Sequence, residues 1–132
     1  MDEATRILVR KRAGYRCEYC RLHEADDAYT FHVEHIIARK HGGLDDESNL
    51  ALACQQCNLH KGSNLSGVDP RSGEIVELFH PRQKIWSEDF LLREYRMVGL
   101  TPCGRTTVSV LNMNDLDRVN LREELQFPDG RR

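Results

Sequence analysis

The sequence predicts a small α+β protein in which short strands and helices are organised around two pairs of cysteines. Three observations predict this class. A length of 132 residues suits a compact core with an elaboration. The composition, 39% hydrophobic and 30% charged, is that of an ordinary soluble globular protein. Cys17 with Cys20, and Cys54 with Cys57, repeat one two-residue spacing on either side of an apolar segment.

The first half of the chain is predicted to contain a helix, then two strands and a second helix. Residues 2–12 carry apolar side chains at helical spacing and predict an amphipathic helix. Residues 31–37 are β-branched and apolar and predict a strand, whereas residues 39–48 hold two glycines and a charge run and predict a solvated loop. A short strand over 49–53 and a helix that ends near Gly62 are expected next.

The second half is expected to form a strand and helix extension packed on the core, so that the chain divides into residues 1–66 and 67–132. Thr101-Pro102 has the residue types of a helix N-cap and first turn. The elements expected there are a strand over 75–79, another within 85–98, and helices over 101–113 and 114–125.

Several aromatic and aliphatic side chains of this extension are expected to form a second core, because the first half is too small to stabilise itself alone. The residues concerned are Leu78, Phe79, Trp86, Phe90 and Leu91. The alternative is a DNA-contacting surface made by His80, Arg82, Lys84 and Trp86.

Charge and hydropathy indicate an intracellular protein. No apolar run approaches the roughly 20 residues that span a bilayer, and no signal peptide begins the chain, so we expect no membrane partner and a cytoplasmic location. The net charge of −2 does not by itself indicate nucleic-acid binding, but basic residues cluster near the N-terminus and recur along the chain. A locally basic face is therefore compatible with the sequence.

The four paired cysteines predict one structural zinc site. Two-residue gaps let each pair present both sulfurs to a single tetrahedral Zn²⁺ ion, and a reducing compartment favours metal over disulfides. A redox CxxC motif or buried free thiols are the alternatives. Glu18 and Tyr19, inside the first pair, are expected to be exposed spacers, and Cys103 to be a small buried side chain.

The region between the cysteine pairs resembles the HNH endonuclease family in its four-cysteine form. The residues that carry this resemblance are Cys17-x2-Cys20, Glu34-His35-Ile36-Ile37-Ala38-Arg39-Lys40-His41-Gly42-Gly43, Ser48-Asn49-Leu50 and Cys54-x2-Cys57-Asn58-x2-Lys61. They cover residues 17–61, about a third of the chain. The resemblance implies a ββα-metal fold that cleaves phosphodiester bonds and leaves 5′-phosphate and 3′-hydroxyl ends.

The resemblance also implies roles for individual residues. His35 corresponds to the general base, and a pKa near neutrality suits a histidine to that task. Glu34 stands where the family usually has an Asp that binds the catalytic Mg²⁺ or Mn²⁺, and Asn58 replaces the final His as the second ligand. Asn49 corresponds to a residue that hydrogen-bonds across the loop and holds the backbone of the catalytic histidine. His60 is the rival to Asn58, although helical geometry points it roughly the opposite way.

One geometric requirement follows from this assignment. Consecutive residues of a strand point to opposite faces, yet Glu34 and His35 must both approach one phosphate. We therefore expect the strand to end, twist or bulge near His35. Ala38, where the family often has Pro, is expected to leave the following loop less stiff.

The sequence thus predicts a metal-dependent HNH endonuclease that acts on DNA. Lys61, Arg39 and Lys40 are expected to hold flanking phosphates. The alternatives are a non-catalytic zinc module that binds nucleic acid or protein, and a subunit active only within a larger nuclease assembly. A homodimer is also compatible with the sequence.

Overall fold

The computed structural model describes residues 1–130, which fall into two compact units. The first unit consists of Met1–Asn64 together with His80–Gln83, and the second of Leu65–Phe79 with the chain from Lys84 onward. The sequence places a boundary after residue 66 and does not predict the return of His80–Gln83 to the first unit. Each unit has its own small antiparallel strand pairs and helices, so the predicted α+β class is confirmed.

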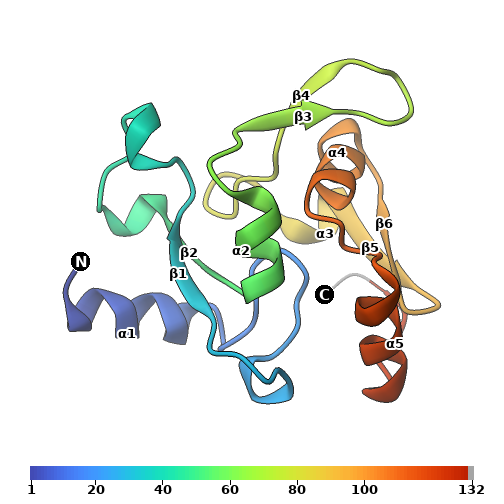
Figure 1. Ribbon diagram of the computed structural model, residues 1–132, viewed down its shortest axis with the longest axis horizontal. Coiled ribbons are helices and arrows are strands. Elements are labelled where there is room, and N and C mark those ends of the chain that lie inside the picture. Colours follow the sequence, from blue (N-terminus) through green and yellow to red (C-terminus); the bar gives the residue numbers. More distant parts are fainter. Residues whose placement is uncertain (131–132) are drawn as a thin grey trace. The chain divides into compact units, whose positions relative to one another are not determined.

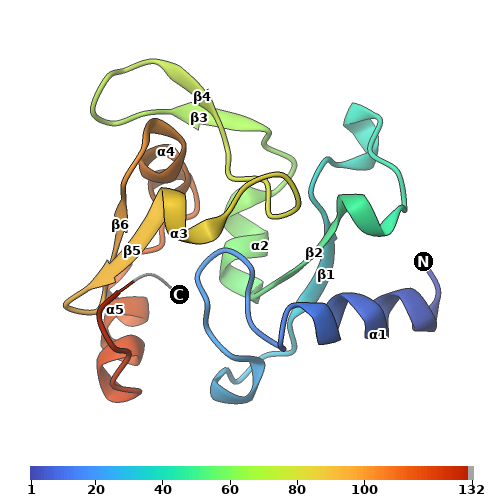
Figure 2. The same cartoon turned by 180° about the vertical axis from the view of Figure 1, so that it is seen from behind.

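The first unit is built on a two-stranded antiparallel sheet with a helix on either side in the sequence. Its elements are α1 (Glu3–Arg12), β1 (His32–His35), β2 (Leu50–Ala53) and α2 (Gln55–Lys61). The register pairs His35 with Leu50 and His32 with Ala53. Figures 1 and 2 show α1 and α2 beside this strand pair, with which both helices are in contact.

The predicted N-terminal helix is confirmed as α1. The side chain of Asp2 accepts a hydrogen bond from the Thr5 backbone at 2.8 Å, and this cap begins the helix. Three basic residues lie in the last turn, where their positive charge stabilises the negative end of the helix dipole. Val9 is fully buried, whereas Ile7 and Leu8 are more than 40% exposed.

The strand that carries the candidate base is shorter than predicted. β1 ends at His35 instead of continuing to residue 37. Beyond His35, the backbone N–H of Ile36 donates to the carbonyl of Asn49, and that of Ile37 donates to the Asn49 side chain. The chain therefore leaves the strand at His35, as the geometry of a shared site requires.

The second unit is made of two β-hairpins and three helices. Its elements are β3 (Ser66–Val68), β4 (Ile75–Glu77), α3 (Trp86–Asp89), β5 (Phe90–Arg93), β6 (Arg96–Gly99), α4 (Pro102–Val110) and α5 (Leu116–Glu124). Figure 1 shows α4 against the β3–β4 hairpin and β6, with which it is in contact. The strand expected within 85–98 is present as β5, but it is half of a hairpin: Glu94 and Tyr95 adopt positive φ and turn the chain back into β6.

The predicted second core is confirmed within this unit. The rings of Phe79 and Trp86 lie 5.2 Å and 5.3 Å from that of Phe90, and all three side chains are buried. Leu92 is buried where Leu91 was expected. The burial of Trp86 argues against the alternative in which it contacts DNA. Among residues 1–130, no helix has the length and apolar content needed to cross a bilayer.

Candidate metal centre and nuclease site

The four paired cysteines converge on one point. Their sulfur atoms all lie within 4.8 Å of one another, and each cysteine is buried. The Sγ atoms of Cys20 and Cys54 are 3.7 Å apart. Four sulfurs about 2.3 Å from a tetrahedral zinc ion would be separated by about 3.8 Å. The residues therefore form a metal site whose dimensions fit zinc.

Local backbone geometry presents the sulfurs to this centre. The N–H of Cys20 donates to the Cys17 sulfur at 3.4 Å, and that of Cys57 donates to the Cys54 sulfur at 3.3 Å. Cys54 is also the N-cap of α2. Burial raises the pKa of Cys17 and Cys57 well above that of a free thiol, so charged thiolates there need a cation beside them.

The expectation that Glu18 and Tyr19 are exposed spacers is wrong. Glu18 is 7% exposed: its carboxylate accepts the N–H of Leu52 at 2.8 Å and pairs with Arg82. Burial, together with the charge of Arg12, lowers the pKa of Arg82 to about 10. Tyr19 is fully buried. In the second cysteine pair, by contrast, Gln55 is exposed, so the burial of Glu18 and Tyr19 comes from their partners and not from the spacing of the cysteines.

Tyr19 joins the first cysteine pair to β1 through Glu34. Its phenol donates to Oε1 of Glu34 at 2.5 Å, while Nζ of Lys61 lies 3.4 Å from Oε2. Burial raises the pKa of Glu34, and the charge of Lys61 and the phenol of Tyr19 oppose this shift. Both partners stabilise the ionised carboxylate, so the group can remain an anion in a buried position.

A pocket of about 360 Å³ lies along β1. Glu34, His35 and Asn58 all line it, together with neighbouring residues of β1, the following loop and the end of α2. Within the described residues, His60 does not line this pocket. The structure therefore brings the three candidate residues to one space and places Asn58, not His60, beside it.

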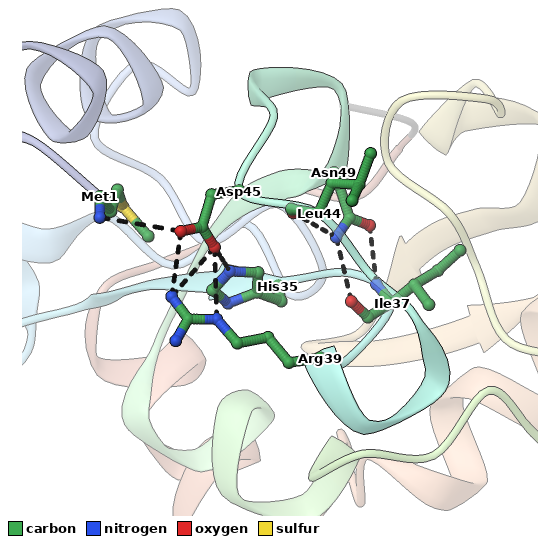
Figure 3. A network of polar contacts seen from close by, with 7 residues as sticks. All are labelled: Met1, His35, Ile37, Arg39, Leu44, Asp45 and Asn49. Atoms are coloured by element: carbon green, nitrogen blue, oxygen red, sulfur yellow. Dashed lines mark hydrogen bonds and ion pairs between the residues drawn. The ribbon is translucent and has the colours of Figure 1, made fainter.

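Asn49 clamps the loop that follows His35. Its Oδ1 accepts the N–H of Ile37 at 2.9 Å, and its Nδ2 donates to the carbonyls of Ile37 and Leu44 at 3.0 Å and 2.9 Å (Figure 3). Gly43 is needed for this arrangement, because a Cβ there would stand 1.7 Å from the Ile37 carbonyl oxygen. The cross-loop bonds expected of Asn49 are present, but the backbone that its side chain holds is that of Ile37 and Leu44 and not that of His35.

The loop after His35 returns to it and places the Asp45 carboxylate against its ring. Nε2 of His35 lies 2.6 Å from Oδ1 of Asp45, and Arg39 approaches both carboxylate oxygens at 3.0 and 3.1 Å (Figure 3). The hydrogen bond with His35, and next that with Arg39, lower the pKa of Asp45. Asp45 remains 45% exposed, but it is not the merely solvated loop residue that the sequence predicted.

Of the three residues expected to hold phosphates, the structure exposes two. Arg39 and Lys40 are exposed on the 3₁₀ turn Arg39–His41. Lys61 is only 2% exposed, and its Nζ donates to the Ile36 carbonyl at 2.8 Å. The expectation of a surface phosphate contact at Lys61 is therefore corrected: its ammonium is directed at the β1 backbone and Glu34.

Two residues of the site escaped sequence reasoning. Tyr19 stands between two cysteines, and nothing in its spacing distinguishes a buried donor from a surface spacer. Asp45 belongs to a run of three acidic residues, Asp45-Asp46-Glu47, in which composition alone does not select one. A pairing could have been suspected only from the two glycines before Asp45, which let the chain turn back toward the strand.

The stretch that holds these residues matches a known protein family. Residues 17–64 match the family model of HNH endonucleases. This stretch contains the four cysteines, β1, β2 and α2, so the resemblance inferred from residues 17–61 is confirmed for this part of the chain.

A particular relative is the Septu protein PtuB of Bacillus thuringiensis, which is 25% identical over 116 residues. The alignment covers 86% of this chain and 42% of PtuB, so the chain spans less than half of that relative's length. No solved structure matches the chain.

Proposed function

We propose that the protein is a metal-dependent endonuclease that hydrolyses phosphodiester bonds of DNA. The observation that carries this proposal is the pocket lined by Glu34, His35 and Asn58, inside the segment that matches the HNH endonuclease model. A base, a carboxylate and a carboxamide around one space are the groups that metal-assisted hydrolysis of a phosphodiester needs.

Zinc is the structural metal in this proposal, held by Cys17, Cys20, Cys54 and Cys57. The sulfur separations and the burial of all four side chains support a closed tetrahedral site. Such a site leaves no open position for substrate, so its role is to fix the ends of the segment that contains β1, β2 and the start of α2.

A second ion, Mg²⁺ or Mn²⁺, is proposed at Glu34 and Asn58. Their oxygen atoms are the hard ligands that these ions prefer. Glu34 already accepts from Tyr19, and Lys61 lies beside its other oxygen. A carboxylate offers about four lone-pair positions, so two partners leave room for an ion. When bound, the ion would neutralise charge on the phosphoryl oxygens and the leaving oxygen.

His35 is the proposed general base. It is partly exposed at the end of β1, and it is one of the residues that line the pocket. The imidazole would take a proton from water as the water oxygen attacks phosphorus. Attack opposite the 3′-oxygen breaks the P–O3′ bond, and the released oxygen takes a proton from solvent. The products are the 5′-phosphate and 3′-hydroxyl ends that the family resemblance implies.

Arg39 and Lys40 are the proposed contacts to flanking phosphates. Both are exposed next to the pocket, whose lining includes Arg39. Arg39 also binds Asp45, so a phosphate would compete with that carboxylate for the guanidinium. Lys40 has no ion pair among the described residues, and we propose it as the more available cation.

A non-catalytic zinc module that binds nucleic acid or protein is the second candidate. One observation favours it: Glu34 is buried and already has two partners, so the carboxylate has a structural use without a second metal. This alternative gives no reason for the pocket beside His35 and Asn58. A role inside a larger assembly or a homodimer is a further proposal, since the chain covers only part of its relative.

Nicking of supercoiled plasmid separates the two candidates. Zinc-loaded wild type with Mg²⁺ or Mn²⁺ should convert plasmid to the nicked form, and a chelator added before the metal should prevent it. His35→Ala should lose about 100-fold or more of the rate, while the control His60→Ala, which changes a histidine outside the pocket lining, keeps it. Plasmid binding without cleavage by the wild type would favour the module, and unchanged cleavage by His35→Ala would exclude the base.

A further inference from the structure

We infer that Asp45 is the positioning residue of His35: it accepts the Nε2–H of the imidazole and thereby leaves Nδ1 to take the proton from water. This inference rests on the proposed nuclease function and adds a residue to it. It comes from the 2.6 Å contact between Nε2 and Oδ1, which links the end of β1 to the loop ten residues later (Figure 3).

The chemistry of the pair determines which nitrogen carries hydrogen. An ionised carboxylate can only accept, so the nitrogen facing it must be the donor. The pKa of Asp45 is lowered by its bonds to His35 and Arg39, and the group is therefore an anion at neutral pH. A neutral imidazole has one N–H, which leaves the lone pair on Nδ1 for an incoming proton.

Two further contacts fix the direction of the Asp45 carboxylate. Arg39 donates to Oδ1 at 3.0 Å and to Oδ2 at 3.1 Å, which holds the plane of the group. Asn49 binds the carbonyl of Leu44, the preceding residue, at 2.9 Å and so holds the backbone from which Asp45 projects.

The Asn49 side chain therefore holds the backbone near both His35 and Asp45. Asn49 binds Ile37 two residues after His35 and Leu44 one residue before Asp45. A ring at the end of a strand can rotate about its side-chain bonds, and the carboxylate on an anchored loop limits that rotation. A base that is already oriented reduces the entropy cost of reaching the transition state.

The first test reads the ring directly and needs no substrate. Long-range ¹H–¹⁵N NMR of zinc-loaded wild type should show His35 in the Nε2–H tautomer. Asp45→Ala should give a mixture of the two tautomers, whereas Glu47→Gln, which removes an exposed charge from the same loop, should not. A wild-type ring with hydrogen on Nδ1, or an unchanged tautomer in Asp45→Ala, would overturn the inference.

The second test is kinetic. Loss of the carboxylate partner of a metal-ligating histidine typically costs about 10- to 100-fold. By analogy, Asp45→Ala should lower kcat by this factor with KM within twofold. Asp45→Asn should recover most of the rate, since its amide oxygen can accept the Nε2–H. Glu47→Gln should match wild type.

A double variant shows whether Asp45 acts through His35. In the His35→Ala background, Asp45→Ala should cost nothing further, because no ring remains to be held. An equal loss in both backgrounds would contradict positioning. A wild-type protein that cleaves nothing would refute the nuclease proposal itself, and the NMR result would still decide the hydrogen bond.

Discussion

The phenolic oxygen of Tyr19 lies 2.5 Å from Oε1 of Glu34, and this bond joins a residue between two metal-site cysteines to the residue before His35. Both side chains are buried. The position of the first cysteine pair is therefore transmitted to β1 by a charge-assisted hydrogen bond as well as by the backbone.

Removal of the phenol should destabilise the protein. Tyr19→Phe deletes one donor to a buried carboxylate, which costs about 1–3 kcal/mol in the free energy of unfolding. Urea denaturation of the zinc-loaded protein measures this change. Tyr29→Phe alters a tyrosine that is 61% exposed and should stay within about 0.5 kcal/mol of wild type. Equal effects of the two substitutions would contradict a role for the buried bond.

Glu34 and Lys61 should be strongly coupled. Lys61→Met leaves the Glu34 carboxylate buried without its cation and should cost about 3–5 kcal/mol. The double variant Glu34→Gln/Lys61→Met should cost less than the sum of the two single changes, by about 1–3 kcal/mol in a double-mutant cycle. Lys40→Met is the exposed control. Additive single effects would show that the two side chains do not interact.

The three hydrogen bonds of Asn49 need both a donor and an acceptor, so replacement of its amide by a carboxylate should destabilise the protein. Asn49→Asp keeps an acceptor for the N–H of Ile37 but places a second oxygen against the carbonyls of Ile37 and Leu44. We expect a loss of about 2–4 kcal/mol in the free energy of unfolding. Asn64→Asp changes an exposed asparagine and should have little effect. A stable Asn49→Asp protein would contradict the clamp.

Loss of one metal-site cysteine should release zinc and unfold the first unit. Cys57→Ser leaves three sulfurs, so bound zinc measured by atomic absorption should fall from one per chain toward zero, and helical circular dichroism should decrease. Cys103→Ser is the matched control, because Cys103 lies outside the four-sulfur cluster. Full zinc content in Cys57→Ser would refute the four-cysteine site.

The second unit should become less stable in acid through Asp69. Its carboxylate accepts two hydrogen bonds from Arg105, at 3.1 and 2.9 Å, and these bonds hold its pKa well below the ordinary value of 3.8. The folded state then binds fewer protons than the unfolded state. The stabilisation is complete above the ordinary pKa and is lost as pH falls below it.

Thermal denaturation between about pH 6 and 3 measures this dependence. Wild type should lose stability on acidification, and Asp69→Asn should have a lower starting Tm and a flatter profile. The exposed residue Asp117 provides the control variant Asp117→Asn. A wild-type slope retained in Asp69→Asn would assign the acid sensitivity to other groups.

Sequence reasoning succeeded where the chemistry depends on local spacing. Four cysteines in two pairs indicate one metal site, because each pair needs only a short backbone turn to present both sulfurs. α1 was predicted from its apolar periodicity, and α4 from the Thr101-Pro102 pair at its start, where the Thr101 side chain accepts from Gly104. The shortened strand at His35 was required by the direction of successive side chains.

The sequence failed where a side chain's environment depends on segments far away along the chain. Lys61 has the residue type of a surface cation, and its burial depends on Glu34 and the Ile36 carbonyl, 25 or more residues earlier. Glu18 is buried because Arg82 returns to the first unit from beyond its predicted boundary. The hairpin at Glu94 and Tyr95 was missed because positive φ is uncommon at non-glycine residues.

Anomalous diffraction from crystals of the zinc-loaded protein with Mn²⁺ and a short DNA duplex tests the central claim most directly. The account predicts zinc among the four cysteine sulfurs and manganese in the pocket, bound by Glu34 and Asn58, with a phosphodiester between the manganese and His35. A pocket without manganese in such crystals, with Glu34 still bound only to Tyr19 and Lys61, would contradict the account.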